Sequence, residues 1–134
     1  MKTYTPSEEE IANSLYKPSY ISFEYALAYY NLIPEMTYQI TSATSKPTRL
    51  FTVNNQTFAY YTIKTEAYTG YTLVKRGDRR FLIAEPEKAV IDYLYFAALG
   101  QRSINDRMRT EGLNREKIAI YTRLYDRTNL NEFV

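Results

Sequence analysis

The spacing of apolar residues changes along the chain, and each change predicts a boundary between helices and strands. Ile11 and Leu15 stand four residues apart, which predicts a short helix over residues 8–16. Ser7 and Glu10 have the spacing of a capping box, in which each side chain bonds the backbone amide of the other. The pattern therefore begins with a capped helix.

A second helical stripe begins after residue 22. Its apolar members recur at intervals of three and four: Phe23, Ala26, Leu27 and Tyr30. Ser22 precedes the stripe and is predicted to be its N-cap. From residue 36 to residue 63 the period falls to two, which predicts three strands.

The strongest hairpin signal lies in residues 71–84. Gly77 and Asp78 separate two alternating runs, and glycine in the first position of a two-residue loop suits a type II′ turn. Pro86 can occupy the first position of the helix that follows. That helix, at about 87–99, is apolar on nearly every side, so it is predicted to be the central core helix.

Two more helices are predicted after Gly100. Ser103 caps the first, in which Ile104 and Met108 share a face, and Asn114 caps the second. Because helices and strands occupy separate stretches, the sequence predicts an α+β fold. We expect a small antiparallel or mixed sheet of about five strands, flanked by about five helices.

Size and charge describe one ordinary domain. The chain has 134 residues, with 17 Lys and Arg against 15 Asp and Glu, for a net charge of +2. It shows no repeat or linker, so we expect a single domain over residues 1–134. No run approaches the ~20 apolar residues of a membrane span. Glutamates also stand where a secretion signal would be apolar, so the sequence predicts a cytoplasmic protein with no membrane partner.

The composition also narrows the chemistry. Cys and His are both absent, which excludes disulfides, thiolate nucleophiles, imidazole bases and the usual zinc sites. The four glycines are isolated from one another, which excludes a glycine-rich phosphate loop. We therefore expect no cofactor.

The sharpest local charge surrounds the predicted hairpin turn. Lys75, Arg76, Arg79 and Arg80 are four cations against one acid, Asp78. This tip is the candidate contact for a phosphate or an acidic partner. The alternative is that these charges protect the strand ends against edge-to-edge pairing.

A second charged cluster lies where the hairpin meets the central helix. Glu85, Glu87, Lys88 and Asp92 could hold Mg²⁺ for phosphodiester chemistry. Their spacing fits a helix start better, because Glu87 favours the positive end of the helix and Lys88 and Asp92 form an i,i+4 pair. We expect structural roles here and no catalytic centre.

Two stretches read together as a family signature. One comprises residues 15–22, 26–27 and 32–35, and the other comprises residues 83–95. They resemble the AbiEi antitoxin family, and residues 40–44, 58–60 and 70–71 continue the family's order, so the resemblance covers roughly residues 11–127. The motif positions that we expect to be structural are Glu85, Pro86, Glu87, Lys88, Asp92 and Tyr93.

The resemblance implies the antitoxin half of a bacterial type IV toxin–antitoxin or abortive phage-infection operon, whose toxin looks like a nucleotidyltransferase. Such antitoxins usually join an N-terminal winged helix, which represses the operon, to a C-terminal domain that counters the toxin. This chain matches only the C-terminal antitoxin domain, so we expect the winged helix to be absent from it. Its implied partner is the cognate toxin, engaged directly or indirectly.

Two other functions remain as alternatives. One is a nucleic-acid-binding transcriptional regulator that uses the basic hairpin and the C-terminal cations Arg107, Arg109, Arg115, Lys117, Arg123 and Arg127. Acids alternate with these cations and screen them, so we expect weak, nonspecific nucleic-acid binding at most. The other is a metal-dependent nuclease, which ranks last. The sequence leaves the oligomeric state open.

Overall fold

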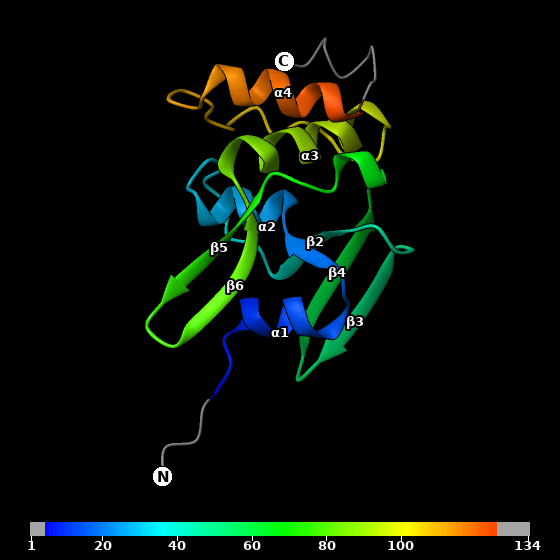
Figure 1. Cartoon of the computed structure of the whole chain (residues 1–134), viewed down its shortest axis with the longest axis vertical. Coiled ribbons are helices and arrows are strands. Elements are labelled where there is room, and N and C mark those ends of the chain that lie inside the picture. The colour runs from blue at the N-terminus through cyan, green and yellow to red at the C-terminus, as the bar shows by residue number, and fades with distance from the viewer. Residues whose placement is uncertain (1–4, 126–134) are drawn as a thin grey trace.

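The computed structural model describes residues 5–125, with three helices stacked toward one end of a twisted sheet (Figure 1). Its elements in chain order are α1 (Glu8–Leu15), β1 (Ser19–Ile21), α2 (Phe23–Tyr29), β2 (Gln39–Thr44), β3 (Arg49–Val53), β4 (Gln56–Thr62), the 3₁₀ turn η1 (Thr65–Ala67), β5 (Tyr71–Arg76), β6 (Arg79–Ala84), α3 (Pro86–Ala98) and α4 (Arg115–Tyr125). The stacked helices are α2, α3 and α4. The predicted α+β class is confirmed.

The sheet is mixed and has six strands in the order β3-β4-β2-β1-β6-β5. Neighbours pair antiparallel, except that β1 runs parallel to β6 and β2 runs parallel to β4. The prediction of five strands missed β1. This strand has only three residues, and all three are buried. It therefore shows no alternation of buried and exposed positions from which a strand could be predicted.

The predicted strands and hairpins are otherwise confirmed. The three strands expected between residues 36 and 63 are β2, β3 and β4. Asn54 and Asn55 close the β3–β4 hairpin with φ of 50° and 66°, as a type I′ turn requires. Gly77 starts the β5–β6 turn with φ of 59°, a conformation that glycine adopts without a steric penalty.

Helix α1 begins with the predicted capping box. The Glu10 amide donates to Ser7 Oγ at 3.3 Å, and the Ser7 amide donates to Glu10 Oε1 at 2.9 Å. The Tyr60 hydroxyl donates to the Ala12 carbonyl at 2.6 Å. This bond joins α1 to the face of the sheet that carries the Tyr60 ring.

Ser22 occupies the predicted N-cap position of α2, but its side chain does not act as the cap. Ser22 makes no capping bond, because its hydroxyl donates to the Asp92 carboxylate instead. The orphan amide of Tyr25 in the first turn donates to Thr41 Oγ1 on β2 at 3.0 Å. A residue from a neighbouring strand therefore caps this helix in place of Ser22, and the local sequence cannot predict this contact.

The central helix α3 forms as predicted. Pro86 is its first residue, and nine of its thirteen residues are buried. It ends at Gly100, which has φ of +79°. The Gln101 amide donates to the Phe96 carbonyl and the Gly100 amide to the Ala97 carbonyl, which is the Schellman arrangement.

The helix predicted after Ser103 does not form. The Tyr93 hydroxyl donates to the Ser103 carbonyl at 2.5 Å and accepts the Asn105 amide at 3.0 Å. The Asn105 side chain accepts the Arg107 amide, a local turn that competes with helix formation. Four helices therefore occur in residues 5–125, where five were expected.

Helix α4 begins at its predicted cap. Asn114 Oδ1 accepts the Lys117 amide at 3.1 Å. No helix within the described residues has both the length and the apolar character needed to cross a membrane.

Candidate functional site

The second charged cluster, identified above from the sequence, lies at the start of α3, against β1 and α4. Lys88 and Asp92 are one helical turn apart, and both side chains are completely buried. Lys88 Nζ lies 2.5 Å from Asp92 Oδ1. The pair predicted from the i,i+4 spacing therefore exists, and it lies in the core rather than at the surface.

Three hydroxyls complete the site around Asp92. Asp92 Oδ2 accepts from Tyr20 at 2.9 Å and from Ser22 at 2.6 Å, and Oδ1 accepts from Tyr125 as well as from Lys88. Four donors fill the acceptor sites of one carboxylate. We call Tyr20, Ser22, Lys88, Asp92 and Tyr125 the buried cluster.

The Lys88 ammonium is also solvated by the protein. Its Nζ donates to the Tyr20 hydroxyl at 2.8 Å and lies 5.4 Å and 5.3 Å from the ring centres of Tyr20 and Tyr125. Burial lowers the pKa of Lys88 below its ordinary value, against the opposing attraction of Asp92. Burial and the Asp92 charge raise the pKa values of Tyr20 and Tyr125 well above their ordinary value.

Gly70 lets the chain pass close to Lys88. A Cβ atom at Gly70 would lie 2.9 Å from Lys88 Cγ and 3.0 Å from a ring carbon of Tyr121, and its φ is +79°. Only glycine suits this position without displacing a neighbour or straining the backbone. The Glu85 amide donates to the Gly70 carbonyl at 2.8 Å, which joins this loop to the start of α3.

The other motif carboxylates hold α4. Glu85 accepts from the Tyr121 hydroxyl and, at 2.9 Å, from Lys117 Nζ, and Glu87 accepts the Asn114 amide at 2.9 Å. Burial of Glu85 opposes its ionisation, but the bonds from Tyr121 and Lys117 prevail and lower its pKa. Glu85 and Glu87 thus pair with α4 and the turn before it.

These placements separate the residues of the suggested magnesium site. Glu85 and Glu87 point to α4, whereas Asp92 is enclosed by its own four donors. Among residues 5–125 there is no group of three or more acidic side chains arranged to hold a metal ion.

The basic hairpin tip forms the second candidate site. Its four cations lie directly opposite one another across the two strands, Lys75 against Arg80 and Arg76 against Arg79, and all four are exposed. Like charges in directly opposed positions destabilise a hairpin. The tip projects from the body of the molecule (Figure 1).

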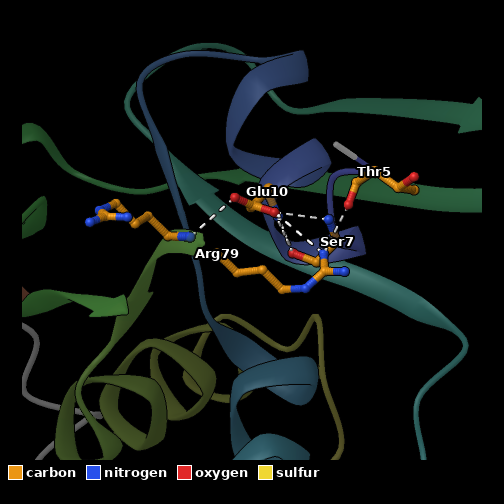
Figure 2. Close-up of polar contacts among 5 residues, drawn as sticks. Thr5, Ser7, Glu10 and Arg79 are labelled. Atoms are coloured by element: carbon orange, nitrogen blue, oxygen red, sulfur yellow. Dashed lines mark hydrogen bonds and ion pairs between the residues drawn. The ribbon is translucent and has the colours of Figure 1, made fainter. Parts of the chain in front are cut away.

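Arg79 differs from the other three cations because it anchors the hairpin to α1. Figure 2 shows its guanidinium beside Glu10, with Nη1 at 3.6 Å from Glu10 Oε1 and at 3.1 Å from the Thr5 carbonyl. Glu10 Oε2 also accepts the Arg80 amide at 3.1 Å. The Arg76 guanidinium lies 5.6 Å from the ring centre of Tyr29.

A cavity of about 720 Å³, which no sequence pattern predicted, lies between α3, residues 104–113 and α4. Apolar side chains from both helices line it, including Val90, Leu94 and Ile118, and the charged Glu111 and Arg115 also border it. The irregular segment after Ser103 forms one of its walls, with Ile104 and Met108 among the lining residues.

Three members of the buried cluster were not predicted: Tyr20, Ser22 and Tyr125. Tyr20 and Ser22 belong to the first family stretch and Lys88 and Asp92 to the second, so the shared signature was the available signal. Tyr125 had no such signal. Of the C-terminal cations, Arg127 lies outside the described residues.

Comparison of this chain with models of known protein families and with curated proteins finds no match.

We predict that removing the Asp92 charge will unfold much of the protein. Asp92→Asn leaves Lys88 buried without a counter-ion, so the free energy of unfolding should fall by about 3 to 5 kcal/mol. Replacing both residues, as Lys88→Met with Asp92→Leu, should recover most of that loss. Urea unfolding measures both effects. Arg107→Ala, which removes a surface pair with Glu35, is the control and should cost under about 1 kcal/mol.

We also predict that stability falls above about pH 10. Tyr20 and Tyr125 stay protonated in the fold at a pH where the unfolded chain ionises, so each reduces the unfolding free energy by about 1.4 kcal/mol per pH unit. Lys88 has the opposite effect, but only below its ordinary pKa. Urea midpoints measured from pH 9 to 11 test this slope.

The matched variants are Tyr20→Phe and Tyr38→Phe, because the Tyr38 side chain is 92% exposed. Tyr20→Phe should reduce the fall of the unfolding free energy with pH by the contribution of one tyrosine, about 1.4 kcal/mol per pH unit. Equal slopes in the two variants would contradict the role assigned to burial.

Proposed function

We propose that this chain is the non-enzymatic effector domain of an AbiEi-like antitoxin, which neutralises a nucleotidyltransferase-like toxin in the bacterial cytoplasm. One observation carries the proposal. The two sequence stretches on which the resemblance rests, although about 70 residues apart, meet at Asp92, where Tyr20 and Ser22 from the first bond the second. Contact between the two stretches is what a fold signature would require, and it supports the resemblance on which the proposal rests.

The buried cluster supports a non-catalytic role in this proposal. Lys88 and Asp92 are the residues best suited to acid–base chemistry, and neither has any exposed surface for a substrate to reach. A catalytic group must come within hydrogen-bonding distance of the atom it acts on. The motif positions therefore maintain the fold, and another surface contacts the toxin.

The basic hairpin tip is the surface we assign to the toxin. Its exposed, opposed cations reduce the stability of the hairpin, and a partner that supplies negative charge would remove that repulsion. Local features that oppose folding without an evident structural gain are expected at functional sites. Operon repression would require a winged helix joined to this domain.

The proposal expects a neighbouring gene that encodes a nucleotidyltransferase-like protein, and the test is co-expression of this chain with that protein. A variant with three hairpin reversals should lose toxin suppression and stay folded: Lys75→Glu, Arg76→Glu and Arg80→Glu. Arg79 is kept because it anchors the hairpin to α1. Bacterial growth after toxin induction is the readout, and far-UV circular dichroism checks folding.

A control with the same change in net charge carries its reversals at the other end of the molecule: Arg109→Glu, Arg115→Glu and Arg123→Glu. All three arginines are exposed, and this variant should suppress the toxin as the original chain does. If the hairpin variant still suppresses the toxin, the contact surface lies elsewhere. If the original chain suppresses nothing, the antitoxin assignment is wrong.

The alternative, a nucleic-acid-binding regulator, is favoured by the same exposed cations. Specific operators are read by an element that enters the major groove together with a broad basic face. Around α4, Lys117 is paired with Glu85, and Arg107 is paired with Glu35. We therefore predict weak, nonspecific DNA binding that disappears as salt rises. Titration against the chain's own promoter and a scrambled duplex measures this, and selective submicromolar binding would favour the regulator.

A further inference from the structure

The outer edge of β5 is available for pairing. This strand is the last of the sheet, and among residues 5–125 no strand pairs with its outer side. In a hairpin closed by two residues, the flanking pair exchanges both backbone bonds and every second pair does the same. The flanking pair here is Arg76 and Arg79, so Tyr71, Leu73 and Lys75 direct their amides and carbonyls outward.

The same three residues present a distinctive surface. Tyr71 and Leu73 are apolar side chains that are 38% and 46% exposed, and Lys75 is exposed beyond them. Across the pair, Leu82 lies opposite Leu73, and Arg80 lies opposite Lys75. One face of the hairpin thus has apolar contacts along its length and paired cations at its tip.

We propose that the outer edge of β5 binds an extended acidic segment of a partner protein as an added strand. The outward backbone groups supply the hydrogen bonds, Tyr71 and Leu73 contact alternate apolar side chains, and Lys75 and Arg80 select carboxylates. The charge complementarity is specific to one end, because β5 carries no charge before Lys75. The partner's acids must therefore lie where its strand reaches the hairpin tip.

Other occupants fit this edge less well. A nucleic acid would bind the cations through its phosphates, but it would not pair with the row of outward amides and carbonyls beside Leu73. A second copy of this chain would add a strand without any carboxylate for Lys75 and Arg80, because β5 contains no acidic residue. An acidic protein strand uses every group that the edge presents.

The opposite edge strand, β3, provides an internal comparison. Leu50 on β3 is also an exposed leucine, 62% exposed, at an outward-facing position of a hairpin closed by two residues. The cation of β3, Arg49, lies instead over aromatic rings, 4.8 Å from the ring centre of Phe51. Thus β3 has the open backbone without the group of exposed cations.

Proline substitution tests the pairing directly. Leu73→Pro removes one outward amide and keeps the bonds between β5 and β6, because proline is tolerated on the open side of an edge strand. Leu50→Pro makes the same change on β3 and is the matched control. A second variant, Lys75→Glu with Arg80→Glu, changes the charge without altering the backbone. Circular dichroism confirms that each variant is folded.

The probe is a blocked peptide with the six-residue length of β5, which carries valines at one end and glutamates at the other, titrated into isotopically labelled protein at low salt. We expect amide resonances of Tyr71, Leu73 and Lys75 to shift. Leu73→Pro and the charge variant should each weaken binding at least about tenfold, and Leu50→Pro should leave it unchanged. A lysine–valine peptide should not bind.

Several outcomes would overturn the inference. These are shifts centred on β3 or the helices, equal binding by Leu73→Pro and the original chain, tighter binding of a single-stranded oligonucleotide at the hairpin, and dimerisation of the chain through β5. The inference rests on the proposed function for the identity of the partner, but the peptide test does not. Failure of the peptide leaves toxin suppression by another surface intact, and failure of toxin suppression leaves the strand-binding edge to another acidic partner.

Discussion

The ion pair between Lys88 and Asp92 is the interaction on which the arrangement of this protein depends. Removing two charges from water costs several kcal/mol for each ion, and attraction between them offsets that cost only when the remaining donors and acceptors are also satisfied. Here the satisfying groups come from β1, from the residue before α2 and from the last residue of α4. Three separate parts of the chain, which are the stretch from Tyr20 to Ser22, α3 and the end of α4, must therefore meet before the pair becomes stable.

This requirement explains the composition. A mean hydropathy of −0.47 is low for a chain with a closed core, but 15 tyrosines supply rings for packing and hydroxyls for polar partners. Tyr60 bonds the carbonyl of Ala12 on α1, and Tyr93 holds the segment after α3. The tyrosine rings thus pack in the core as apolar side chains do, and the tyrosine hydroxyls form hydrogen bonds between elements. The elements are therefore joined by directed hydrogen bonds as well as by buried apolar surface.

Patterns that are local in the sequence predicted local structure well. The capping box of α1, the two-residue turn at Gly77 and Pro86 at the start of α3 each depend on neighbours within a few residues, and each was predicted correctly. Failures arose where a distant group decided the outcome. The Ser22 hydroxyl donates to Asp92 and so does not cap α2. The Tyr93 hydroxyl bonds the Ser103 carbonyl and holds the following segment in an irregular conformation. The i,i+4 spacing of Lys88 and Asp92 identified the pair but carried no information on its burial, which depends on Tyr125.

The position of Tyr125 also bears on how the protein is made. The strands and α3 leave the ribosome before α4, but until Tyr125 emerges Asp92 lacks one of its donors and Lys88 lacks one of its two aromatic faces. A nascent chain can collapse around its apolar residues at that stage without completing its polar centre. The polar centre can therefore be completed only after the final described helix has been synthesised, and a ribosome stalled before that point would hold a domain whose buried cluster lacks Tyr125.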